Sequence, residues 1–233
     1  DGWVALSEQA TDMDLKLNTA AIQFKEILSL IPAIYAKDFE TLKTSGNVSM
    51  EAFAKGKMEG NNLPQLSVKL NVKDGMFRYP SLPAGVDNIQ VNMEITNPGG
   101  DADLTQIKVQ PFSFSLAGNP FSLTAEVQTP VSDPDFKFAA KGTLNLGKIK
   151  EVYPLEDMEL NGIINADMSV ARKLSYIEKE IYDKISASGN IHLKSMTLKT
   201  KDMPDITIQQ STFSFAPQYL NLSETTVNIG KND

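Results

Sequence analysis

The chain has 233 residues, a net charge of −7, one histidine and no cysteine. An acidic chain without clustered Lys and Arg is poorly suited to hold phosphate backbones, so nucleic acid is not an expected partner. The lack of cysteine excludes disulfides, thiolate nucleophiles and Cys-ligated zinc. No apolar run reaches the roughly 18 residues that a membrane-spanning helix needs.

Alternation of apolar and polar residues recurs along most of the chain and predicts β-strands. The clearest case is residues 87–96 (DNIQVNMEIT), where every second residue from Ile89 to Ile95 is apolar. Side chains of a strand point to opposite faces with a period of two, so this segment has one apolar face. In chain order the alternating segments are residues 13–17, 68–72, 87–96, 121–127, 144–146, 164–170, 206–208, 213–215, 220–222 and 227–229.

Stretches rich in Gly, Pro, Asn and Asp separate these segments, as in NPGGDAD (residues 97–103), and they are typical of turns. Long strands joined by short turns predict an antiparallel sheet. Both ends of the chain resemble strands that are interrupted partway, so we expect the chain to be a piece of a longer protein.

Two segments change the phase of the alternation. In residues 107–116 (IKVQPFSFSL), the apolar residues before Pro111 have one parity and those after it have the other. Residues 191–198 (IHLKSMTL) show the same slip after Leu193. A one-residue slip turns apolar side chains to the wrong face unless a β-bulge absorbs it. We therefore expect both strands to bend at these points.

Two segments, near residues 20–37 and 172–185, have helical spacing and place their isoleucines and leucines on one face. Pro32 is expected to kink or divide the first of them. Each segment follows an alternating strand and precedes an SGN tripeptide, which predicts an internal repeat. We expect the tripeptides, residues 45–47 and 188–190, to begin equivalent strands. The whole chain is then a single β-rich region over residues 1–233, with possible repeat units 1–100 and 160–233 joined by strands in 101–159.

The expected fold class is mainly β (α+β): a long, curved antiparallel sheet with repeated strand–helix–strand units and two short amphipathic helical segments. Such a sheet has one apolar face that needs a cover, and only two helices are expected. Either the sheet folds back on itself as a sandwich or barrel, or part of the apolar face stays open to a ligand.

The residue types that carry chemistry do not form a catalytic pattern. His192 has polar-face parity and lacks a partner His or Cys, so it is expected to be a solvated strand residue. Asp101 and Asp103 lack the spacing of a calcium loop, and Asp133 and Asp135 flank a proline in a predicted turn. We therefore expect no enzyme activity, no metal and no cofactor.

The sequence resembles the AsmA family of bacterial envelope proteins, with features of the Bacteroides group. The resemblance lies in a strand, the helix FKEILSLIPAIY and LKTSGNVSM, followed by LPQLSVKLNVKDGMFRYPSLPAGVDNIQVNMEI. It continues in AGNPFSLTAEVQTPVSDPDFKFAAKGTLNLGKIKEVYP and in the closing FSFAPQYLNLSETTVNIGKND. The resemblance implies a periplasmic protein that an N-terminal helix, absent from this chain, holds in the inner membrane. It also implies a likeness to bridge-like lipid-transfer proteins, whose long sheets form a groove with an apolar lining.

The function expected from these features is outer-membrane assembly or homeostasis, in which the chain binds or conducts phospholipid or another acyl lipid along an apolar β-groove. The candidate groove residues are Val68, Leu70, Val72, Ile89, Val91, Met93, Ile95, Phe112 and Phe114. The alternative is a structural or protein-interaction β-module of the cell envelope, whose core is closed and whose strand edges recruit envelope protein partners.

Overall fold

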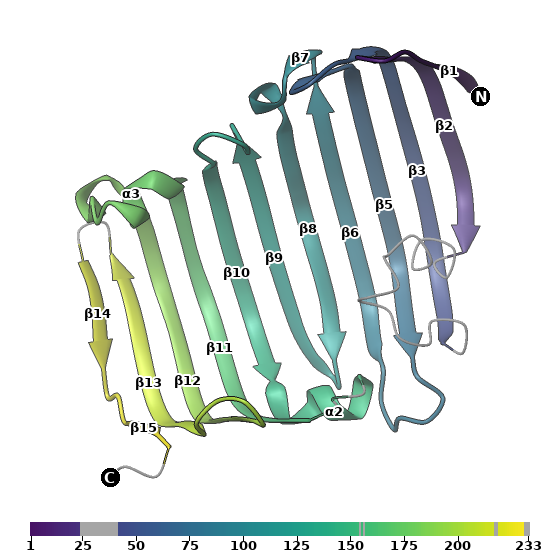
Figure 1. Cartoon of the computed structure of the whole chain (residues 1–233). Coiled ribbons are helices and arrows are strands. Elements are labelled where there is room, and N and C mark those ends of the chain that lie inside the picture. Colours follow the sequence, from purple (N-terminus) through teal and green to yellow (C-terminus); the bar gives the residue numbers. More distant parts are fainter. Residues whose placement is uncertain (24–41, 154, 156, 217–218, 231–233) are drawn as a thin grey trace.

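A computed structural model describes residues 1–23, 42–153, 155, 157–216 and 219–230 of the chain. Among these residues, 13 strands form one antiparallel sheet that extends across the whole molecule (Figure 1). The fold is therefore mainly β, as the alternation predicts. The strands follow one another in the sheet almost in chain order, and every neighbouring pair is antiparallel.

The first half of the sheet contains β1 (Gly2–Leu6), β2 (Thr11–Gln23), β3 (Lys43–Met58), β5 (Gln65–Arg78), β6 (Val86–Asn97) and β8 (Gln106–Leu116). The second half contains β9 (Asn119–Gln128), β10 (Asp135–Asn145), β11 (Met158–Lys173), β12 (Ser186–Thr200), β13 (Ile206–Ala216), β14 (Tyr219–Ser223) and β15 (Val227–Ile229). A separate small pair joins β4 (Asn62–Leu63) to β7 (Gly100–Asp101).

The sheet is open. Among the described strands, β1 forms one edge, and β14 and β15 together form the other, because they pair with different parts of β13. No pairing between the described strands closes the sheet into a barrel, and the described residues do not form a second large sheet that could make a sandwich. Of the two architectures that the sequence leaves open, the described structure has the single layer.

Both phase slips coincide with β-bulges, which confirms the expected irregularities. The ladder between β8 and β9 shifts between Val109 and Phe112, where the chain passes Pro111. The ladder between β11 and β12 shifts between Asn161 and Ile163, opposite Ser195, whose φ is 51°. Each bulge adds a residue to one strand, so the apolar residues on both sides of the slip return to the same face.

The helical elements are shorter than the spacing predicts. In place of one helix over residues 172–185, β11 continues to Lys173 and is followed by α3 (Leu174–Glu178) and the 3-10 turn η5 (Tyr182–Lys184). Residues 20–23 belong to β2, because they pair with β3 at Ser49, Val48 and Asn47. The rest of the first expected helix lies outside the described residues.

In the described loops lie three more short helical elements: η3 (Ala102–Leu104), η4 (Leu146–Lys148) and α2 (Ile149–Val152). Figure 1 shows α2 at one end of the strands and α3 at the other. Helical elements of the described chain therefore lie near the ends of the strands.

The two SGN tripeptides occupy the same place in their strands. Gly46 is the fourth residue of β3, Gly189 is the fourth residue of β12, and both have a positive φ. The close approaches differ, because Gly46 lies against Gly75 of the following strand and Gly189 against Asp167 of the preceding one. The helix expected in the first copy falls outside the described residues, so the repeat units stay a prediction.

Candidate functional site: an apolar face of the sheet

The pairing register brings the apolar residues of successive strands into rows. Residues paired across an antiparallel ladder share a face, so each row crosses the sheet from strand to strand. One row is Met50, Leu70, Met93, Val109, Ala125, Phe138, Val170 and Ala187. The row on one side is Ala52, Val68, Ile95, Ile107, Val127 and Phe136. The row on the other side is Val48, Val72, Val91, Phe112, Leu123, Ala140 and Met168. Together these three rows are called the apolar face below.

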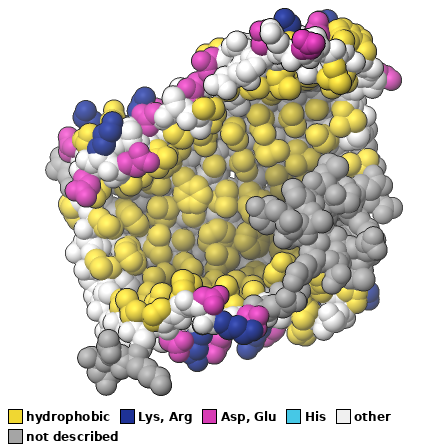
Figure 2. Space-filling view, in the orientation of Figure 1, with side chains coloured by type: hydrophobic (Ala, Val, Ile, Leu, Met, Phe, Trp, Pro, Cys, Tyr) yellow, Lys and Arg dark blue, Asp and Glu magenta, His cyan; other side chains and the backbone are white. Residues whose placement is uncertain are grey.

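Figure 2 shows this face as a broad yellow surface between two rims that carry charged side chains. Most of its side chains are half-buried, including Val68, Met93 and Ile107. In the described part of the chain no second layer packs on the centre of the face. A soluble protein rarely exposes so large a contiguous apolar surface unless something binds there.

One end of the apolar face is closed by a small core. Val48, Val72, Val86, Ile89, Leu116 and Val152 are buried and form one cluster, with Val152 only 2% exposed. Val152 comes from α2, which is held over the strand ends by the hydrogen bond that the Ala84 amide donates to the Glu151 carbonyl oxygen, 3.0 Å. Tyr153 packs edge-on against Tyr79, with ring centroids 5.9 Å apart. This cluster gives the sheet a fixed, conventionally packed end.

All nine candidate groove residues are strand residues of β5, β6 and β8, and the structure divides them into three groups. Val72 and Ile89 belong to the closed cluster, at 3% and 5% exposure. Leu70, Val91, Phe112 and Phe114 pack against that cluster and are half-buried. Val68, Met93 and Ile95 lie farther along the same face, outside the buried cluster, and are half-buried. These last three are the candidates best placed to meet a ligand.

The apolar face extends beyond the candidates into β9–β13. At its far end a cavity of about 540 Å³ is lined by Val170, Ile177, Tyr182, Ile185, Ala187, Phe215, Ala216, Tyr219 and Leu220. This volume is in the range typical of small-molecule sites. Sequence reasoning missed the cavity residues as candidates, although Phe215, which alternates with Phe213, was a usable signal.

The opposite face is polar, and its charges alternate in a row. The register places Glu51, Lys69, Glu94, Lys108, Glu126 and Lys137 side by side across six strands. Ion pairs join Lys69 to Glu94 at 3.4 Å, and Lys108 and Lys137 to Glu126 at 3.6 and 3.4 Å. The two lysines lower the pKa of Glu126, with the Lys137 hydrogen bond as the largest cause. This face is suited to water, so an apolar ligand has only one face to bind.

The described residues contain no cluster of side chains suited to hold a metal ion. His192 is an exposed strand residue, and its Nδ1 lies 3.1 Å from Thr212 Oγ1 in a solvent-exposed hydrogen bond. Asp103 accepts hydrogen bonds from the amides of Val131 and Ser132, and Asp133 accepts from Ser175, so these carboxylates join loops. No helix in the described part of the chain is long and apolar enough to cross a bilayer.

Comparison of the chain with protein-family models, curated protein sequences and solved structures gives no match. The resemblance to the AsmA family therefore stays an expectation from the sequence, and the function is inferred from the geometry of the apolar face.

Proposed function

We propose that this chain is a non-enzymatic, periplasmic segment of an AsmA-like envelope protein that binds or conducts phospholipid along its apolar face, in support of outer-membrane assembly or homeostasis. The observation that supports lipid binding is the apolar face itself: three adjacent rows of apolar side chains, half-buried along most of their length. The envelope location and the tether to the inner membrane rest on the sequence resemblance alone.

The energetics of acyl-chain burial favour this function. Each buried methylene stabilises by about 0.8 kcal/mol, so about ten methylenes on the apolar face gain about 8 kcal/mol before ordering costs are subtracted. An acyl chain needs no specific polar partner to gain this energy. A lipid conduit can therefore work without any catalytic or metal-binding motif, and the head group stays in water beside the charged rims.

A crosslinking pair on β6 tests the proposal. A photo-reactive residue at Met93 lies on the apolar face, and one at the adjacent Asn92 lies on the polar face of the same strand. We expect phospholipid adducts in cells at Met93 and none at Asn92, together with phospholipid that co-purifies with the chain in native mass spectra. Equal or absent labelling, in variants that fold and localise normally, would contradict lipid binding.

One feature favours the second candidate function, a protein-interaction module. Asp1 and Lys16 exchange both backbone hydrogen bonds, at 2.9 and 2.7 Å. In an antiparallel ladder such pairs alternate, so the backbone groups of Gly2, Val4 and Leu6 point away from β2. Val4 and Leu6 are also 51% and 82% exposed, and β1 contains no Lys or Pro that would block the addition of a strand.

The substitution Val4→Pro separates the two functions. It removes an outward amide without removing a hydrogen bond to β2, so the sheet should tolerate it. If the chain is a protein-interaction module, Val4→Pro abolishes partner capture. If the chain binds lipid along the apolar face, lipid binding is unchanged in this variant.

A further inference from the structure

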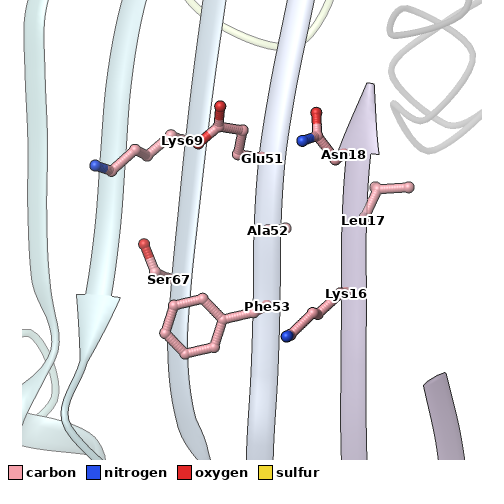
Figure 3. Close-up of a pocket in the computed structure, with 8 residues that line it drawn as sticks. All are labelled: Lys16, Leu17, Asn18, Glu51, Ala52, Phe53, Ser67 and Lys69. Carbon is pink, nitrogen blue, oxygen red and sulfur yellow. The ribbon is translucent and has the colours of Figure 1, made fainter. Parts of the chain in front are cut away.

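A hollow on the polar face is chemically different from its surroundings. It has a volume of about 310 Å³ and is lined by residues of β2, β3 and β5, among them Lys16, Asn18, Glu51, Phe53, Ser67 and Lys69 (Figure 3). The register places Lys16, Phe53 and Ser67 in one row and Asn18, Glu51 and Lys69 in the next. The side chain of Phe53, 37% exposed, is thus an aromatic ring set among polar side chains.

The polar groups around Phe53 are not engaged with one another. Elsewhere on this face charges pair, as in Lys55 with Asp14 at 3.0 Å and Lys141 with Asp167 at 2.9 Å. Within the described part of the chain, Lys16, Asn18, Glu51 and Ser67 make no side-chain hydrogen bond or ion pair. Their donors and acceptors are available to a ligand that lies on the ring.

We propose that this hollow binds a pyranose ring of a neutral glycan, with the apolar C–H face of the sugar stacked on Phe53. Figure 3 shows the Phe53 ring lying beside β3 toward β5, near Ser67, with the Lys16 side chain extending from β2 toward it. A flat ring removes the C–H face of a sugar from water, and the polar side chains around it reach the hydroxyl groups at the sugar's edge.

The set of polar groups selects hydroxyls over other ligands. A hydroxyl both donates and accepts, and the hollow offers an acceptor in Glu51, a donor in Lys16, and groups that do both in Asn18 and Ser67. Phosphate would leave the Glu51 carboxylate without a donor and beside a second negative charge, and of the two lysines that line the hollow, Lys69 is already paired with Glu94 at 3.4 Å. An acyl chain would leave all four polar groups without partners, which is unfavourable. The volume, at the low end for ligand sites, fits a small ligand.

Because the hollow is shallow and open to solvent, we expect weak binding, with a dissociation constant on the order of 1 mM for a short oligosaccharide. The test is amide-resolved NMR of the whole chain titrated with triacetylchitotriose or maltotriose. Saccharide should shift the amides of Asn18, Glu51, Phe53 and Ser67, and inorganic phosphate should not.

Four variants make the titration decisive. Phe53→Ala should weaken binding about tenfold and Phe53→Trp should preserve or strengthen it, because stacking area sets the affinity. Glu51→Ala should weaken binding. Gln106→Ala is the matched control, because Gln106 lies on the same polar face three strands from Phe53 and should leave binding unchanged. The inference is overturned if no saccharide shifts these amides, if phosphate shifts them as strongly, or if Phe53→Ala binds like the wild type.

Discussion

The same substitution at two positions of β5 measures how far the apolar face is covered. Val68 and Val72 point to the same face, since they pair with Ile95 and Val91 of β6. Val72 is 3% exposed inside the closed cluster, whereas Val68 is half-buried and outside it. Val68→Ala and Val72→Ala therefore remove identical atoms from one face of one strand, and they differ only in what surrounds those atoms.

Truncating a fully buried valine to alanine loses about 1.6 kcal/mol of transfer free energy for two methyl-sized groups, and the cavity it leaves raises the cost to about 2.5 kcal/mol. At Val68 roughly half of the transfer term applies and no closed cavity forms, so the expected cost is about 0.8 kcal/mol. Val72→Ala should thus lower the free energy of unfolding by about 1.7 kcal/mol more than Val68→Ala does.

Urea unfolding followed by circular dichroism gives both free energies by linear extrapolation. If Val68→Ala lowers the free energy of unfolding of the lipid-free protein as much as Val72→Ala does, a second layer covers the face at Val68, and the face is not open there. If phospholipid binds the face, adding it should stabilise the wild type by mass action and widen the effect of Val68→Ala.

Three further predictions follow from local geometry. Gly189 has a φ of 100°, and a Cβ added there would collide with the Asp167 carbonyl oxygen, so Gly189→Ala should lower the free energy of unfolding by more than about 3 kcal/mol. Gly118 has a φ of 85° with open space around it, so Gly118→Ala should cost only about 1 kcal/mol of backbone strain. Thermal unfolding of both variants measures the difference. Hydrogen bonds from Ser175 and then the charge of Lys173 lower the pKa of Asp133. The stabilisation is therefore present above the unfolded pKa of about 4 and is lost as the pH falls through the folded value. The difference in unfolding free energy between wild type and Asp133→Ala should shrink in acid, and a constant difference would refute the assignment. Glu126→Gln should destabilise at low salt and approach the wild type at high salt, because its ion pairs with Lys108 and Lys137 are solvent-exposed; a salt-independent difference would contradict this.

Local patterns in the sequence were sufficient to predict many of the strands. Residues 87–96 alternate without interruption, and β6 covers Val86–Asn97. The phase slips at Pro111 and after Leu193 located both bulges, because a strand with one apolar face cannot lose its phase without inserting a residue. The polar-face position of His192 followed from the same parity.

Helical spacing was the weaker signal. Residues 20–23 fit an apolar helical stripe, yet Ala20 and Ile22 pair with Ser49 and Val48 of β3. Backbone pairing with a neighbouring strand supplies hydrogen bonds that no local pattern reports, so it can override helical propensity. The division of residues 172–185 into α3 and η5 has the same origin, because β11 stays paired with β10 up to Lys173.

The sequence by itself determined which residues of each strand are apolar, and so it determined that the sheet has an apolar and a polar face. Which residues of different strands stand side by side was decided only by the tertiary structure, because alternation repeats every two residues and is compatible with many registers. The same holds for the closed cluster around Val72 and the open surface around Val68. Both valines have the same pattern in sequence. Among the described residues, Val72 is buried in the cluster that includes Val152 of the distant α2, whereas Val68 lies outside this cluster and stays half-buried.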